Sequence, residues 1–140
     1  MLIISTIYKK IEGFCWNNIL NPNARLLKVK LKQVSVNDVG SMSLLSTFHL
    51  LSNKYIIGLL NTNLIFDYYR EFVNCTVNVQ INDIRQIPII IPDNKQLSSI
   101  ETLVNEAIII KTTSINNERY NELLNIEYTI EQEVLQLYQI

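Results

Sequence analysis

The feature that most constrains the fold is an apolar run, Tyr-Ile-Ile-Gly-Leu-Leu, at residues 55–60. Ser52 stands before it at the spacing of a helix N-cap, so we expect a helix that begins at Lys54. A helix that is apolar nearly all round must be covered by other elements. The sequence therefore predicts that this helix is buried.

A strand is predicted over residues 26–36, where apolar and polar side chains alternate from Leu27 onward. In such a strand Lys28, Lys30 and Lys32 share the face opposite the core, at steps of about 6.6–7 Å.

Three further segments have strand character. Residues 39–48 are interpreted as a strand or a strand pair, and residues 7–16 are ambiguous between a short helix and a strand. Residues 86–92 are interpreted as an edge strand or the start of a strand, because Pro88 and Pro92 have no N–H to donate.

Helices dominate the second half of the chain. A helical run is predicted over residues 64–72, and residues 74–82 are interpreted as a loop or strand. Asp93 and Gln96 have the spacing of a capping box, which indicates a helix that breaks near residues 112–117. The last helix has apolar residues at three- and four-residue steps, with glutamates off that stripe: Leu123, Ile126, Ile130, Val134 and Leu137.

These elements predict an α+β fold in which a mixed-sheet region is followed by a C-terminal helical hairpin. We expect an α/β region over residues 1–92 and a helical region over residues 93–140. The hairpin either packs on the rest of the chain or docks on another protein, and the pattern leaves both alternatives open.

The charge is distributed unevenly. Residues 1–36 hold six of the twelve basic side chains against one acid, although the formal net charge of the whole chain is −1. Residues 93–140 hold three basic and eight acidic side chains. A basic half beside an acidic half indicates a polyanion-binding surface at one end and a solvated helical end at the other.

No catalytic constellation is recognisable. The one histidine, His49, lies in an apolar stretch and is interpreted as a structural residue, and a triad or metal site lacks partners. The three glycines stand apart, so there is no phosphate loop. Asn21-Pro22-Asn23 is interpreted as a turn. We expect no cofactor, no metal, no transmembrane helix and no membrane partner, and a cytoplasmic protein.

Several motifs resemble those of a known family. Residues 54–64, Lys-Tyr-Ile-Ile-Gly-Leu-Leu-Asn-Thr-Asn-Leu, resemble a helix written Tyr-Leu-Leu-Gly-Leu-Leu-Asn-Ser-Lys-Leu in restriction–modification target-recognition domains. Residues 83–92 resemble the following segment with its Ile-Pro-Ile-Pro-Ile-Pro run. Residues 96–111 and 126–138 resemble the closing helices of the family, and Trp16-Asn17 and residues 38–43 also fit its patterns.

Over residues 14–140 the chain resembles the TaqI-like C-terminal specificity domain of type IIG restriction–modification DNA methyltransferases, which is related to type I specificity subunits. The resemblance implies sequence-specific recognition of double-stranded DNA and no catalysis by these residues. In that family the domain follows an adenine-N6 methyltransferase domain, which has no counterpart here. The resemblance therefore implies that the chain is a separate specificity fragment or part of a split enzyme, with a methyltransferase domain or subunit as partner. The alternatives are a protein-interaction module and an inactive truncated fragment.

DNA affinity comes first from phosphate neutralisation, and specificity comes from side chains that bond base edges. The basic candidates for phosphate contact are Arg25, Lys28, Lys30 and Lys32. The candidates for reading bases are Asn17, Arg70, Asn74, Asn78, Gln80, Asn82 and Arg85.

Overall fold

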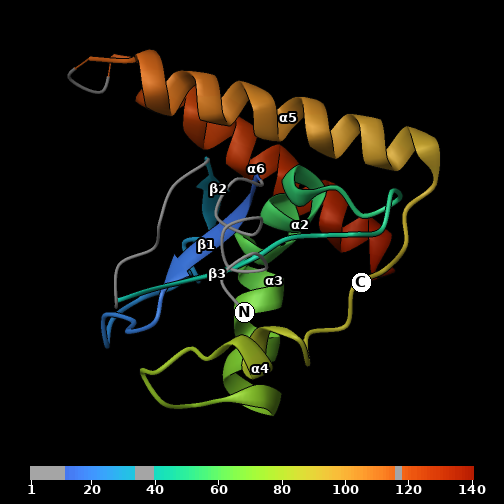
Figure 1. The fold of residues 1–140 in the computed structure, drawn as a ribbon. Coiled ribbons are helices and arrows are strands. Elements are labelled where there is room, and N and C mark those ends of the chain that lie inside the picture. Colours follow the sequence, from blue (N-terminus) through green and yellow to red (C-terminus); the bar gives the residue numbers. More distant parts are fainter. Residues whose placement is uncertain (1–11, 34–39, 116–117) are drawn as a thin grey trace, which may run out of the picture.

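The computed structural model describes residues 12–33, 40–115 and 118–140. A three-stranded antiparallel sheet, in the order β2-β1-β3, is followed by helices (Figure 1). The sheet consists of β1 (Gly13–Asn17), β2 (Lys30–Lys32) and β3 (Ser41–Leu44). The helical elements are α2 (Asn53–Leu60), α3 (Asn63–Tyr68), the π-helical turn η1 (Tyr69–Val73), α4 (Ile81–Ile84), α5 (Asn94–Thr113) and α6 (Tyr120–Leu137).

The α+β class and the C-terminal hairpin are confirmed, but both described strand pairings are antiparallel where the sequence predicts a mixed sheet. A parallel pairing needs a crossover, usually through a helix, and residues 18–29 between β1 and β2 contain none. The ambiguity over residues 7–16 is resolved as a strand from Gly13 onward, and residues 7–11 lie outside the described residues.

The central strand β1 is covered on both sides, since Phe14, Cys15 and Trp16 are all buried. A Cβ at Gly13 would lie 2.4 Å from the carbonyl oxygen of Leu44, so the approach of β3 requires glycine at this position.

The strand predicted over residues 26–36 is wrong in its extent, because β2 covers only Lys30–Lys32. Lys28 has a φ of 54°, in the left-handed region, and this interrupts the extended chain before β2. The alternation still holds around it: Leu27 and Val29 are buried and Lys28 is exposed. Residues 34–36 lie outside the described residues.

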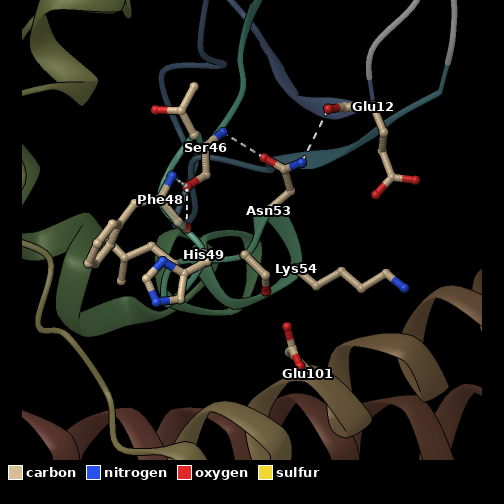
Figure 2. A pocket seen from close by; sticks show the side chains of 10 residues that line it. Glu12, Ser46, Phe48, His49, Asn53, Lys54 and Glu101 are labelled. Carbon is tan, nitrogen blue, oxygen red and sulfur yellow. Dashed lines mark hydrogen bonds between the residues drawn. The ribbon is translucent and has the colours of Figure 1, made fainter.

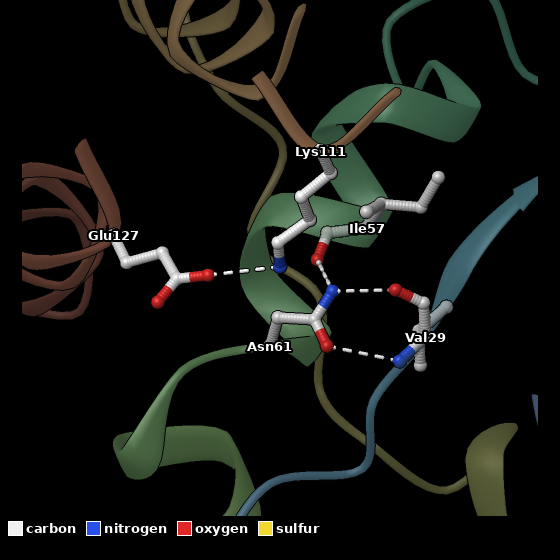
Figure 3. A network of polar contacts seen from close by, with 5 residues as sticks. All are labelled: Val29, Ile57, Asn61, Lys111 and Glu127. Carbon is white, nitrogen blue, oxygen red and sulfur yellow. Dashed lines mark hydrogen bonds and ion pairs between the residues drawn. The ribbon is translucent and has the colours of Figure 1, made fainter. Parts of the chain in front are cut away.

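One side chain takes the place of a neighbouring strand beside Val29. The Asn61 amide donates from Nδ2 to the Val29 carbonyl at 2.7 Å and accepts at Oδ1 from the Val29 N–H at 2.9 Å (Figure 3). Asn61 Nδ2 also donates to the Ile57 carbonyl at 3.0 Å, which joins the end of α2 to this segment. The N–H and C=O of Val29 thus have hydrogen-bond partners although Val29 pairs with no strand.

Lys32 differs from its predicted position. Only 7% of this residue is exposed, and its ammonium reaches the Gln33 carbonyl at 3.5 Å. A long aliphatic stem can be covered in this way while its charged end finds a polar partner. Lys32 therefore does not share an exposed face with Lys28 and Lys30.

Helix α2 is buried, as predicted. The Ser52 side chain caps it by accepting from the Tyr55 N–H, although the helix begins one residue earlier than expected, at Asn53. In Figure 1 it lies between the sheet and the α5–α6 hairpin. A Cβ at Gly58 would come within 2.8 Å of Ile100 Cγ2 on α5, so glycine permits this close helix contact.

The hairpin packs on the rest of the chain. The predicted cap of α5 is confirmed: the Asp93 side chain accepts from the Gln96 N–H at 2.8 Å, and the Gln96 side chain accepts from the Asp93 N–H at 2.9 Å. Four residues of the predicted α6 stripe are buried: Ile126, Ile130, Val134 and Leu137. Polar contacts add to this packing, because Glu131 of α6 accepts from the N–H groups of Asn63 and Leu64 at the start of α3.

The strand predicted over residues 86–92 is not formed. This segment is held by tyrosine hydroxyls, with Tyr55 donating to the Ile90 carbonyl at 2.8 Å and Tyr138 donating to the Pro88 carbonyl at 2.6 Å. Because Pro88 and Pro92 have no N–H, the segment lacks the donors of a full ladder. No helix in the described residues is long and apolar enough to span a bilayer.

We predict that Asn61→Ala lowers the free energy of unfolding by about 1–3 kcal/mol, because it leaves the N–H and C=O of Val29 without these partners. Urea unfolding followed by circular dichroism measures the change. The control is Asn121→Ala on the exposed side of α6, for which we expect a change within about 0.5 kcal/mol. Equal stability of the Asn61 variant and the unaltered chain would contradict this role.

Candidate nucleic-acid interface

Two polar segments that are far apart in the sequence lie side by side. Residues 18–25, which follow β1, and residues 74–80, which follow η1, are called the loop pair below. The Leu20 N–H donates to the Val77 carbonyl and the Val79 N–H donates to the Asn18 carbonyl, both at 2.8 Å. These bonds form a single antiparallel bridge between Ile19 and Asn78. The segment 74–82, predicted as a loop or strand, is therefore a loop with one strand-like contact up to residue 80, and the prediction is wrong at its end, where α4 begins at Ile81.

Buried aromatic residues hold the loop pair from inside. The Trp16 Nε1 of β1 donates to the Val79 carbonyl at 3.1 Å, and Val79 itself is fully buried. The Tyr69 hydroxyl donates to the Asn78 carbonyl at 3.5 Å. Burial, together with the nearby Asp83 carboxylate, raises the pKa of Tyr69 to about 12, so this hydroxyl remains a donor at neutral pH.

Asn74 is a base-reading candidate whose side chain is already used inside the loop. Its Nδ2 donates to the Asn78 carbonyl at 2.9 Å and to Asp83 Oδ2 at 2.8 Å. Its Oδ1 accepts from the Thr76 N–H at 2.8 Å. These bonds give Asn74 a role in shaping the loop.

Arg70 and Arg25 both line one hollow beside the loop pair. Arg70 Nη1 donates to the Thr76 carbonyl at 2.6 Å, which fixes the guanidinium against the loop. Arg25 is exposed, and it follows a turn in which the Ala24 N–H donates to the Asn21 carbonyl at 2.8 Å. The hollow measures about 370 Å³, and its lining is Leu20, Asn21, Pro22, Asn23, Ala24, Arg25, Phe66, Asp67, Arg70 and Val77.

Neither arginine forms an ion pair with a carboxylate among the residues that the structure describes. Within the parts of the chain that the structure describes, the ion pairs are Lys111–Glu127 at 2.9 Å and Arg119–Glu122, both in the hairpin. Asp67 also lines the hollow, but it forms no ion pair with Arg25 or Arg70. Two arginines and one aspartate therefore line the same hollow.

The other base-reading candidates lie on exposed surfaces. Asn78 and Gln80 belong to the loop pair, while Asn82 and Arg85 belong to α4 and its end. Arg85 Nη1 donates to Asn82 Oδ1 at 3.4 Å, and the Asp83 carboxylate accepts from the Gln80 N–H at 2.8 Å. Asn17 is exposed at the end of β1, directly before the loop pair. Of the phosphate candidates, Lys28 and Lys30 are exposed and Lys32 is buried.

A second hollow of about 440 Å³ lies near the start of α2 (Figure 2). His49, Lys54 and Glu101 line it, so charges of both signs meet there. His49 is exposed, and its ring lies edge to face with that of Phe48, with ring centroids 5.0 Å apart. Residues 12–33, 40–115 and 118–140 contain no group of His, Cys, Asp and Glu side chains that could hold a metal ion.

No protein-family model, curated protein or solved structure matches this chain.

The sequence alone did not predict that the residues around the hollow lie close together. The turn at residues 21–23 was predictable from Asn-Pro-Asn, and it is confirmed by the Asn23 N–H, which donates to Asn21 Oδ1 at 2.9 Å. Its position beside residues 74–80 was not predictable, and Phe66 and Asp67 had no local signal beyond the helical pattern. The one available hint was that both segments are rich in asparagine.

We predict that Asn74→Ala and Asn78→Ala differ in stability. Asn74→Ala should lower the free energy of unfolding by about 1–2 kcal/mol, because the Asp83 carboxylate and the Thr76 N–H lose a partner. Asn78→Ala should change it by less than about 0.5 kcal/mol, because its exposed side chain is not used inside the loop. Urea unfolding of both variants tests the contrast. An equal loss in the two variants would contradict the assignment of Asn74 to the loop and Asn78 to the surface.

Proposed function

We propose that this chain is a sequence-specific DNA recognition module of a restriction–modification system. It directs an adenine-N6 DNA methyltransferase or endonuclease to its site, and it is not catalytic by itself. The observation that supports this most is the hollow beside the loop pair, which is lined by Arg25 and Arg70, and neither of them has a carboxylate partner in an ion pair among the described residues. The resemblance of residues 14–140 to TaqI-like specificity domains supports the kind of system.

The proposed mechanism separates affinity from specificity. Exposed Lys28, Lys30 and Arg25 neutralise phosphates, which supplies affinity that does not depend on the base sequence. Asn78, Gln80, Asn82 and Arg85 then bond base edges, since asparagine and glutamine fit adenine and arginine fits guanine. The inner contacts of Asn74 and Trp16 fix the loop on which these side chains stand, which reduces the entropy lost on binding.

We predict that the chain binds duplex DNA in a salt-sensitive manner and that Lys28→Ala or Lys30→Ala each lowers the slope of log K against log salt by about one. Fluorescence anisotropy of a labelled duplex at several salt concentrations measures this slope. The control is Lys95→Ala at the exposed start of α5, which should leave the slope unchanged. Absence of binding even at low salt would overturn the proposed function, and an unchanged slope in the lysine variants would overturn their assignment.

We also predict that the chain alone transfers no methyl group from S-adenosylmethionine to DNA. Incorporation of tritium from labelled cofactor into the duplex is the measurement, with an active adenine methyltransferase as the positive control. Label incorporated by the pure chain would show that it is an enzyme and would contradict the proposal.

A second candidate is a protein-interaction module that recruits a methyltransferase through the hairpin. It is favoured by a row of exposed apolar side chains at four-residue steps on α6, where Tyr120, Leu124 and Tyr128 are 53%, 42% and 66% exposed. A row of this kind is suited to a helical partner. Light scattering of the chain with and without a methyltransferase that lacks its own specificity region distinguishes this function from DNA binding by the loop pair.

A further inference from the structure

The hollow beside the loop pair has walls from three separate segments. The turn that ends at Arg25 forms one wall, α3 and η1 contribute Phe66, Asp67 and Arg70, and Val77 comes from the tip of the second loop. Its volume of about 370 Å³ falls within the range of small-molecule sites, roughly 300–1,000 Å³. The walls are held by backbone bonds between the loops, so the hollow exists before any ligand arrives.

The lining combines apolar surface with a few polar groups. Val77, 39% exposed, supplies most of the apolar surface, because Leu20 and Phe66 are each only 7% exposed. Arg70 uses an Nη1 N–H on the Thr76 carbonyl and keeps further donors, since a guanidinium has five. The Asp67 carboxylate can only accept.

This lining indicates what kind of ligand fits. Two guanidinium groups against one carboxylate favour an anion, and arginine pairs well with phosphate oxygens. The exposed side chain of Val77 favours a flat ring, and Asp67 can accept from an amino group on that ring. A nucleotide has all three features, whereas a simple anion would leave the apolar surface and Asp67 unused.

We propose that this hollow binds a single nucleotide, with its phosphate at Arg25 and Arg70, its base against Val77, and Asp67 accepting from the base. The inference deepens the proposed function and rests on it where the nucleotide belongs to a bound DNA strand. A free nucleotide has the same chemistry, and the experiment distinguishes these two sources.

The first arm uses isothermal titration of the full chain with deoxyadenosine monophosphate, deoxyadenosine and inorganic phosphate as probes. We expect the nucleotide to bind more tightly than either part alone, and Arg70→Ala to weaken it at least about tenfold, as expected for the loss of a charge-assisted bond. Val77→Glu places a carboxylate in the hollow and should also weaken binding. Val77→Thr, of nearly the same shape, is the matched control and should bind normally.

The second arm uses a duplex that carries 2-aminopurine, whose fluorescence rises when the base leaves the stack. A rise on binding that is lost in Val77→Glu, while anisotropy still reports bound duplex, supports a nucleotide from the DNA strand. Nucleotide binding in the first arm without this rise supports a free nucleotide.

The two proposals fail separately. Equal affinity for phosphate and nucleotide, or binding that is insensitive to both Arg70→Ala and Val77→Glu, overturns the nucleotide site even when the chain binds duplex DNA. Conversely, an absence of duplex binding overturns the DNA recognition function, and the first arm alone then decides whether the hollow takes a nucleotide. Circular dichroism of each variant confirms that it is folded.

Discussion

The rest of the structure depends on the close contact of α2 with α5 at Gly58, where a Cβ would lie 2.8 Å from Ile100 Cγ2. This contact places a buried helix between the sheet and the hairpin, and α2 then holds segments on every side. Near its start the Asn53 side chain accepts from the Ser46 N–H at 2.9 Å, and at its end Asn61 binds the backbone of Val29. The hydroxyl of Tyr55 holds the carbonyl of Ile90. One buried helix thereby contacts four other parts of the chain, three of them distant in the sequence.

In the loop pair, hydrogen bonds from inner side chains hold the backbone, and other polar side chains are exposed to solvent. Trp16, Tyr69 and Asn74 donate hydrogen bonds to loop carbonyls, so the backbone of residues 74–80 is held without the side chains of Asn78 and Gln80. Asn78 and Gln80 can then face a ligand at little cost to stability. The same division explains why one loop contains both a structural asparagine, Asn74, and a surface asparagine, Asn78.

Local signals predicted the helices well, and long-range contacts explain where prediction failed. The Ser52 cap, the capping box of Asp93 and Gln96, and the apolar stripe of α6 depend on near neighbours, and all are present. The prediction of a strand over residues 26–36 was wrong in extent because the backbone of Lys28 is in the left-handed region. The carbonyl of Val29 is bonded by the side chain of Asn61, which is distant in the sequence, and not by a neighbouring strand. The hollow lined by Arg25 and Arg70 was not predicted for the same reason, because β2, β3 and α2 lie between these two residues in the sequence.

The most direct test of the central claim is to map the backbone amide shifts of the labelled chain by NMR during titration with duplex DNA. DNA recognition by the loop pair predicts perturbations concentrated in residues 18–25 and 74–85 and near Lys28 and Lys30, with little change along the exposed face of α6. Perturbations centred on Tyr120, Leu124 and Tyr128, or none at saturating DNA, would contradict it.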